Sequence, residues 1–116
     1  MKTGAGRKLG RRGGMRTQML RSLATDLLRH EQITTTISKA KECSRLANHM
    51  IAVAKHNDLN ARRKVVRDIQ DREVVKKLFD VLIHRYNART GGCIRIFRLE
   101  RRQGDNAEMA LVKLIA

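Results

Sequence analysis

The chain has 116 residues, enough for one domain that buries roughly two-thirds of the surface its unfolded chain exposes. Its 26 lysines and arginines outnumber 11 acidic residues, so the formal net charge is +15, and only 3% of the residues are aromatic. No run of about 18 apolar residues is present and no apolar segment follows the basic N-terminus, so we expect neither a transmembrane helix nor a signal peptide.

Residues 1–14 differ in composition from the rest of the chain. They hold five of the eight glycines and five basic residues, and no acidic residue precedes Asp26. Such a segment has almost nothing apolar to bury, so it cannot offset the entropy lost on becoming ordered. We therefore expect a flexible basic arm over 1–14, of the kind that binds a polyanion, and a single globular domain over 15–116.

The domain begins with helical periodicity. Leucine and alanine recur at steps of three and four residues from Leu20 to Leu28 and predict a helix over about 14–30. The β-branched run 33–37 (ITTTI) then predicts a short strand. We expect Ser38 to cap a second helix, which should end near 56–57.

Two aspartates are placed to start further helices. Asp58 is expected to cap a helix over 59–69, and Asp71 a fourth helix that ends before the glycine pair 91–92. The apolar stripe of the fourth helix is expected to be buried, and it consists of Val74, Val75, Leu78, Phe79, Leu82 and Tyr86.

The last quarter predicts a β-hairpin. The isoleucine-rich run 93–99 and the apolar run 109–115 flank a polar loop whose residues 104–106 (GDN) favour a turn. The element order is therefore helix, strand, three helices, two strands. Because so few strands must cover their apolar face with helices, we predict an α+β fold: a two-layer domain with a small mixed sheet and a C-terminal hairpin.

The sequence holds no constellation for covalent chemistry. His30 and Glu31 are adjacent, so they point in different directions, and the glycines of the arm lack the flanking strand of a phosphate-binding loop. Cys43 and Cys93 have no partner at metal-ligand spacing and are expected to be reduced thiols. We therefore predict no enzyme activity, no metal and no cofactor.

The basic clusters carry the functional signal. Of the 26 cations, 17 are arginines, whose planar guanidinium can bind two phosphate oxygens at once. The cluster 62–64 (RRK) or the pair 101–102 (RR) alone could be only a solvated surface. Together with the arm they predict a surface that gains affinity for a polyanion by releasing counterions.

Self-repulsion at this charge predicts a neutralising partner. Nucleic acid is the first candidate and an anionic membrane surface the second. The scarcity of aromatic residues argues against a platform on which single-stranded bases stack. We therefore expect recognition of the backbone and shape of folded RNA, or non-specific binding of duplex DNA, and composition does not choose between them.

A series of short motifs runs in order along nearly the whole chain. They are 6–11 (GRKLGR), 19–31 (MLRSLATDLLRHE), 33–36 (ITTT), 39–42 (KAKE), 60–63 (NARR), 74–79 (VVKKLF), 85–86 (RY), 89–92 (RTGG), 95–96 (RI) and 102–110 (RQGDNAEMA). As a set, and with this spacing, the motifs closely resemble the bacterial large-subunit ribosomal protein L17 family.

The resemblance implies a structural constituent of the large ribosomal subunit in the cytoplasm, near the exit of the polypeptide tunnel. Its partners would be large-subunit (23S-type) rRNA and neighbouring ribosomal proteins, with no membrane, small-molecule substrate or cofactor, and it would support subunit assembly and translation. The residues that the arm and the matching motifs suggest as RNA contacts are Lys2, Arg7, Lys8, Arg11, Arg12, Arg16, Arg21, Arg62, Arg63, Arg89, Arg95, Arg101 and Arg102.

The chain departs from the family pattern at a few positions. Residues 13–15 (GGM) stand where the family has Ser-Ser-His, so contacts of those side chains do not carry over. Cys93 replaces a usual aromatic residue, Glu108 a common proline, and the loop after Leu99 lacks the family's Gly-Pro. None of these changes touches the apolar stripes, so we expect the fold to be unaffected.

Two other functions remain open from the sequence. A nucleoid-type DNA binder would share the charge, but it would bind duplex DNA as well as rRNA and form a symmetric dimer. An RNA-modifying enzyme would need a reactive group, for which His30 and Cys43 are the candidates.

Overall fold

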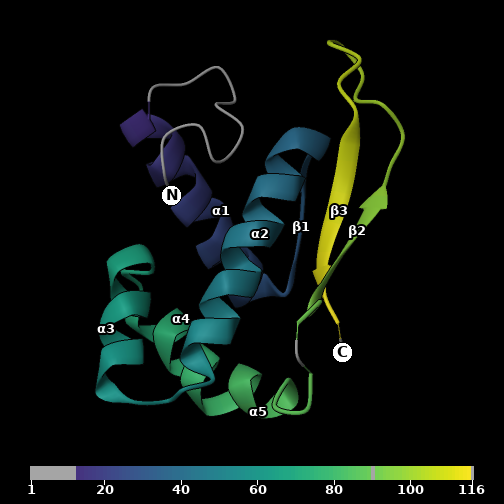
Figure 1. Ribbon diagram of the computed structural model, residues 1–116. Coiled ribbons are helices and arrows are strands. Elements are labelled where there is room, and N and C mark those ends of the chain that lie inside the picture. Colours follow the sequence, from purple (N-terminus) through teal and green to yellow (C-terminus); the bar gives the residue numbers. More distant parts are fainter. Residues whose placement is uncertain (1–12, 90, 116) are drawn as a thin grey trace.

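The computed structural model describes residues 13–89 and 91–115 (Figure 1). The predicted arm lies outside the described residues except for Gly13 and Gly14, which belong to the first helix. In chain order the elements are α1 (Gly13–His30), β1 (Gln32–Thr36), α2 (Ile37–Ala54), α3 (Leu59–Asp68), α4 (Arg72–Lys77), the π-helix η1 (Leu78–Leu82), α5 (Ile83–Arg85), β2 (Ile94–Arg98) and β3 (Met109–Leu114). Because α4, η1 and α5 follow one another without a break, this order confirms the predicted helix, strand, three helices and two strands.

The three strands form one sheet in the order β1-β3-β2, and β2 and β3 form the predicted hairpin. Both pairings are antiparallel, so the expectation of a mixed sheet was wrong. The reason is the position of β3. A mixed sheet would require β1 and β2, which run in the same direction, to be neighbours, but β3 lies between them.

The helices α1 and α2 pack on one side of this sheet (Figure 1). Alternate strand residues point toward them: Ile94, Val112 and Leu114 are all less than a tenth exposed. From the helices, Leu27 and Ile51 enter the same core. The two predicted layers are therefore confirmed, and the predicted stripe of the fourth helix is buried apart from the partly exposed Val75.

The caps were predicted correctly for two helices and incorrectly for one. The Asp58 carboxylate accepts from Ala61 N at 2.7 Å, and that of Asp71 accepts from Glu73 N at 2.9 Å. Ser38 is not a cap, because α2 begins at Ile37 and its N-cap is Thr36, which makes no side-chain cap hydrogen bond. The amide of Ile37 instead donates to the Glu108 carbonyl at 2.9 Å, so a backbone group of the hairpin takes the place of a capping hydroxyl.

Glu31 lies where α1 ends and β1 begins, with a φ of 66°. Its carboxylate accepts hydrogen bonds from Arg85 and, at 3.2 Å, from Lys77. Its carbonyl accepts from Leu114 N at 2.9 Å. One residue therefore connects α1, the central strand β3 and the helical segment α4–η1–α5. The Arg85 hydrogen bond, aided by Lys77, holds the pKa of Glu31 below its ordinary value of 4.5.

We predict that Glu31→Gln destabilises the protein at neutral pH but not in acid. A lowered pKa in the folded state means that folding favours the ionised carboxylate, so its contribution is present above pH 4.5 and is lost as pH falls through the folded-state pKa. Denaturant midpoints of wild type and variant should therefore differ most at neutral pH and converge in acid. Glu100→Gln, in the loop after β2, should leave the midpoint nearly unchanged, and a Glu31→Gln effect that is constant with pH would contradict the ion-pair account.

Candidate nucleic-acid interface

The helix α3 presents a dense group of cations. Of its ten residues only Ala61 and Val65 are buried, so most of its circumference faces outward. The neighbouring α4 adds two further exposed cations. We call this surface the helical basic face, and it consists of Arg62, Arg63, Lys64, Arg67, Arg72 and Lys76, all exposed.

A groove of about 340 Å³ runs along this face between α3 and α4. Arg62, Arg72 and Lys76 line it, together with apolar side chains that include Val66 and with Asp80. The Arg62 guanidinium lies 4.4 Å from the centre of the Phe79 ring, a cation–π contact that limits the orientations available to this side chain. The groove therefore combines an apolar lining with cationic groups, an arrangement suited to a ribose–phosphate backbone.

The hairpin carries a second group of exposed cations, which we call the hairpin basic group: Arg98, Arg101 and Arg102. All three have carboxylate partners within the hairpin. Arg102 forms two hydrogen bonds with Asp105, one of them at 3.1 Å. Arg101 and Arg98 lie 3.3 and 3.9 Å from the Glu108 carboxylate. The hydrogen bonds from Arg102 and from the Ala107 amide lower the pKa of Asp105 to about 2, so Asp105 stays ionised at neutral pH and holds Arg102 near the turn.

The two surfaces lie far apart. In Figure 1 the helix α3 and the tip of the hairpin are at opposite ends of the molecule, whose longest dimension is 45 Å. The structure therefore brings Arg62 and Arg63 together on one surface and Arg101 and Arg102 together near the tip of the hairpin, whereas Arg95 lies near the start of β2, opposite Lys113. It does not join them into one continuous patch.

The other predicted contact residues lie elsewhere. Arg89 is exposed in the turn after α5, where its carbonyl accepts from Lys55 Nζ. Arg21 is partly exposed and bonds Asp68 through Nε at 2.8 Å. Arg16 is only 5% exposed, so it offers little surface to a phosphate. Five predicted contacts fall outside the described residues: Lys2, Arg7, Lys8, Arg11 and Arg12.

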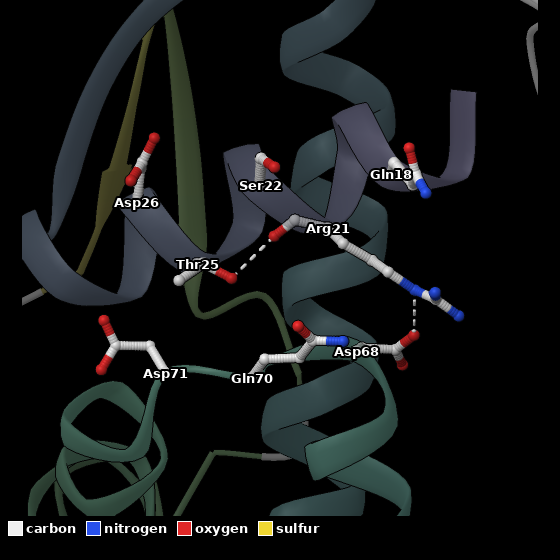
Figure 2. Close-up of a pocket in the computed structure, with 8 residues that line it drawn as sticks. All are labelled: Gln18, Arg21, Ser22, Thr25, Asp26, Asp68, Gln70 and Asp71. Atoms are coloured by element: carbon white, nitrogen blue, oxygen red, sulfur yellow. Dashed lines mark hydrogen bonds and ion pairs between the residues drawn. The ribbon is translucent and has the colours of Figure 1, made fainter. Parts of the chain in front are cut away.

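A polar groove of about 460 Å³ separates α1 from the α3–α4 connection (Figure 2). Its lining includes Asp26, Asp68 and Asp71, which makes it acidic. Arg21 pairs with Asp68, while Arg29 pairs with Asp71 and lies 3.7 Å from Asp26. The carboxylates are thus balanced by arginines of α1. Within residues 13–89 and 91–115, no group of three or more His, Cys, Asp or Glu side chains is arranged to hold a metal ion.

The sequence offered Cys43 and His30 as candidates for a reactive group. Neither lies in an arrangement that would activate it within the described residues. Cys43 is fully buried, and burial, aided by the charge of Asp26, raises the pKa of its thiol to about 12. His30 is exposed at the end of α1. No helix in the described part is long and apolar enough to cross a membrane.

Comparison with known proteins gives the family. Residues 19–115 match the family model described as ribosomal protein L17. Three relatives are each named large ribosomal subunit protein bL17. The Halothermothrix orenii protein is 50% identical over 109 residues, 94% of this chain and 96% of its own. The Caldanaerobacter subterraneus protein is 50% identical over 109 residues (94% and 97%), and one from Thermus thermophilus is 49% identical over 112 (96% and 95%).

This chain belongs to the ribosomal protein L17 family. The resemblance seen in the sequence motifs is thereby confirmed. The family is a structural, non-enzymatic component of the ribosome, so the protein is a cytoplasmic ribosomal protein and not an enzyme.

Sequence reasoning missed part of the helical basic face. The missed cations are Arg67, which follows the predicted cluster 62–64 on α3, and Arg72 and Lys76, which come from α4. Their contribution depends on how the two helices pack, which no local motif specifies. The one usable signal was the spacing of four residues between Arg72 and Lys76, which places them on the same side of a helix.

We predict that Cys43 is unreactive in the native protein. Both cysteines are buried, and the thiolate needed for reaction is scarce when the thiol pKa is about 12. In a Cys93→Ser variant, which isolates Cys43, a thiol reagent at about pH 8 should react only slowly until denaturant is added. Rapid reaction of the folded variant would contradict this and would reopen the possibility of a catalytic thiol.

Proposed function

We propose that the protein is a structural constituent of the large ribosomal subunit that binds large-subunit (23S-type) rRNA through the arm and the two described basic surfaces. In this proposal it lies near the exit of the polypeptide tunnel, beside other ribosomal proteins, and supports subunit assembly and translation. The observation that carries the proposal is the helical basic face, with six exposed cations on two adjacent helices of a ribosomal protein. The names of the relatives, large ribosomal subunit protein bL17, support the choice of subunit.

The physical basis is neutralisation of phosphate. Arginine N–H groups donate to phosphate oxygens in pairs, and each neutralised phosphate releases condensed counterions. Because the helical basic face and the hairpin basic group lie at opposite ends of the molecule, they would contact separate segments of rRNA. A compact cationic domain between two such segments offsets their mutual repulsion and helps to fix their packing.

The arm has a different role in this proposal. Its basic residues Arg7, Lys8, Arg11 and Arg12 would follow an RNA groove, where negative charge is dense. The glycines between them allow the backbone to approach phosphates closely, since they have no side chain in the way. Ordering of the arm would then occur on binding, at a cost in entropy that the phosphate contacts offset.

The first experiment is sedimentation of a cell lysate through a sucrose gradient at low and at high salt, with detection of this protein. We expect it to migrate with large subunits at near-unit stoichiometry and to remain there at moderate salt. Migration at the top of the gradient, or with DNA, would contradict the proposal. Competition between rRNA and duplex DNA for the purified protein then tests the preference for RNA directly.

We predict that removing cations from the helical basic face or from the arm weakens rRNA binding and flattens its salt dependence. The double variant Arg62→Ala/Arg63→Ala should lower the slope of log affinity against log salt by about two, roughly one for each phosphate that is no longer neutralised. Changing Arg7, Lys8, Arg11 and Arg12 to alanine should lower it further and reduce incorporation into subunits.

A matched control is Lys39→Ala/Lys41→Ala, which removes the same charge as the α3 variant from α2, outside both basic surfaces. This variant should change the slope much less. An equal effect of the two double variants would mean that net charge, and not the helical basic face, determines binding. Unchanged incorporation of the arm variant would exclude the role assigned to the arm.

A further inference from the structure

The sheet has a second face that no described helix covers. Helices α1 and α2 contact the side of the sheet that carries Ile94 and Val112, as the burial of these residues shows. Because successive residues of a strand point to opposite sides, the intervening residues point away from the helices. We call this side the outer sheet face.

The register of the strands arranges the outer sheet face in three rows of three residues. The β3 residue occupies the centre of each row, with a β1 residue on one side and a β2 residue, or the residue after β2, on the other. The rows are Gln32–Lys113–Arg95, Thr34–Leu111–Phe97 and Thr36–Met109–Leu99. Leu99 belongs to the third row because its amide donates to the Met109 carbonyl at 2.9 Å.

Four side chains of two adjacent rows form a continuous apolar cluster. Phe97 is 48% exposed and Leu99 is 44% exposed, and Leu111 and Met109 beside them are partly exposed. Directly opposite residues on neighbouring strands have Cβ atoms only about 4.5–5.5 Å apart, so the register places these side chains next to one another rather than singly in solvent. A contiguous exposed apolar cluster on a small soluble domain commonly marks a contact surface.

The charge on this face has one sign. None of the nine positions is acidic, and the two cations, Arg95 and Lys113, are cross-strand neighbours in the first row. Like charges placed opposite each other are unfavourable in a sheet. A partner that places a carboxylate over this row would relieve that repulsion while its apolar side chains cover the cluster.

We propose that the outer sheet face is a docking surface for a neighbouring protein of the large subunit that presents aliphatic side chains next to carboxylates. This inference rests on the proposed function. The apolar cluster favours a protein over RNA, because four hydrocarbon side chains offer no hydrogen bond to phosphates or base edges and Phe97 alone among them can stack on a base. It favours a different protein over a second copy of this chain, because the copy carries the same +15 charge and the same face without carboxylates.

Site-specific crosslinking in assembled subunits tests the assignment. The photoreactive residue p-benzoylphenylalanine replaces Phe97 in the full chain, large subunits are isolated and irradiated, and the crosslinked product is sequenced. The matched control places the same residue at Val66, which is 50% exposed and lies among Arg62, Arg63 and Arg67 on the helical basic face.

We expect the Phe97 position to crosslink to a segment of another protein with aliphatic and acidic residues, and the Val66 position to crosslink to rRNA. Crosslinking of the Phe97 position to rRNA, to a second copy of this chain or to nothing would overturn the inference. If the Phe97 position fails in this way but the Val66 position still crosslinks to rRNA, the proposed function stands and only the docking surface is overturned. If the protein is absent from large subunits, the docking surface and the proposed function are both overturned.

A charge exchange tests the electrostatic half of the inference. Arg95→Glu/Lys113→Glu should lower the crosslink yield at position 97 about tenfold or more, because like charges across an interface cost several kcal/mol. Replacing the carboxylates of the crosslinked partner segment by lysine should restore the crosslink yield of the charge-reversed variant. A variant that had lost its yield through misfolding would not recover in this way. An unchanged yield in the charge-reversed variant, or no recovery after the exchange, would overturn the assignment.

Discussion

The structure depends on a single acidic residue at a chain reversal. Glu31 ends α1 in the left-handed region of φ, and its carboxylate binds Lys77 and Arg85 from the helical segment that is far away in sequence. Its carbonyl accepts the amide of Leu114 at the end of the central strand. The chain has more than two cations for every anion. Glu31 pairs with two of these cations, Lys77 and Arg85, and so uses their charge to hold distant segments together. The same carboxylate also links the α4–η1–α5 segment to the end of α1.

The remaining charge is distributed unevenly over the molecule. Carboxylates gather in the groove between α1 and the α3–α4 connection, where Asp68 and Asp71 are matched by Arg21 and Arg29. The cations of α3 lie outside this groove, and those of the hairpin lie at the other end of the molecule. The acidic groove borders the helical basic face, since Gln70 lines both grooves. The hairpin cations are paired with Asp105 and Glu108, so intramolecular ion pairs also lie within a surface that we assign to RNA.

Much of this architecture was predictable because it follows from local periodicity. The apolar stripes, the caps at Asp58 and Asp71 and the hairpin are each encoded within a few neighbouring residues, and all were confirmed. The errors came from long-range pairing. Ser38 has no capping role because the hairpin supplies a carbonyl to Ile37, and the sheet is antiparallel because β3 enters between β1 and β2. At the candidate site, sequence identified the basic clusters, but only tertiary structure shows that Arg21 is bonded to Asp68 and that Arg16 is buried.

The burial of Tyr86 has an experimental consequence. It is the only tyrosine of the chain, which has no tryptophan, and its side chain is 1% exposed with its hydroxyl donating to the Ile115 carbonyl. Ultraviolet fluorescence of this protein therefore reports on one location, the contact between the end of the helical segment and the end of the sheet. An unfolding curve recorded by tyrosine fluorescence therefore follows the separation of the two layers at Tyr86. Fraying of helix ends elsewhere does not change this signal. Agreement with circular dichroism, which averages over all the helices, would show that the layers separate at the same point as the helices melt.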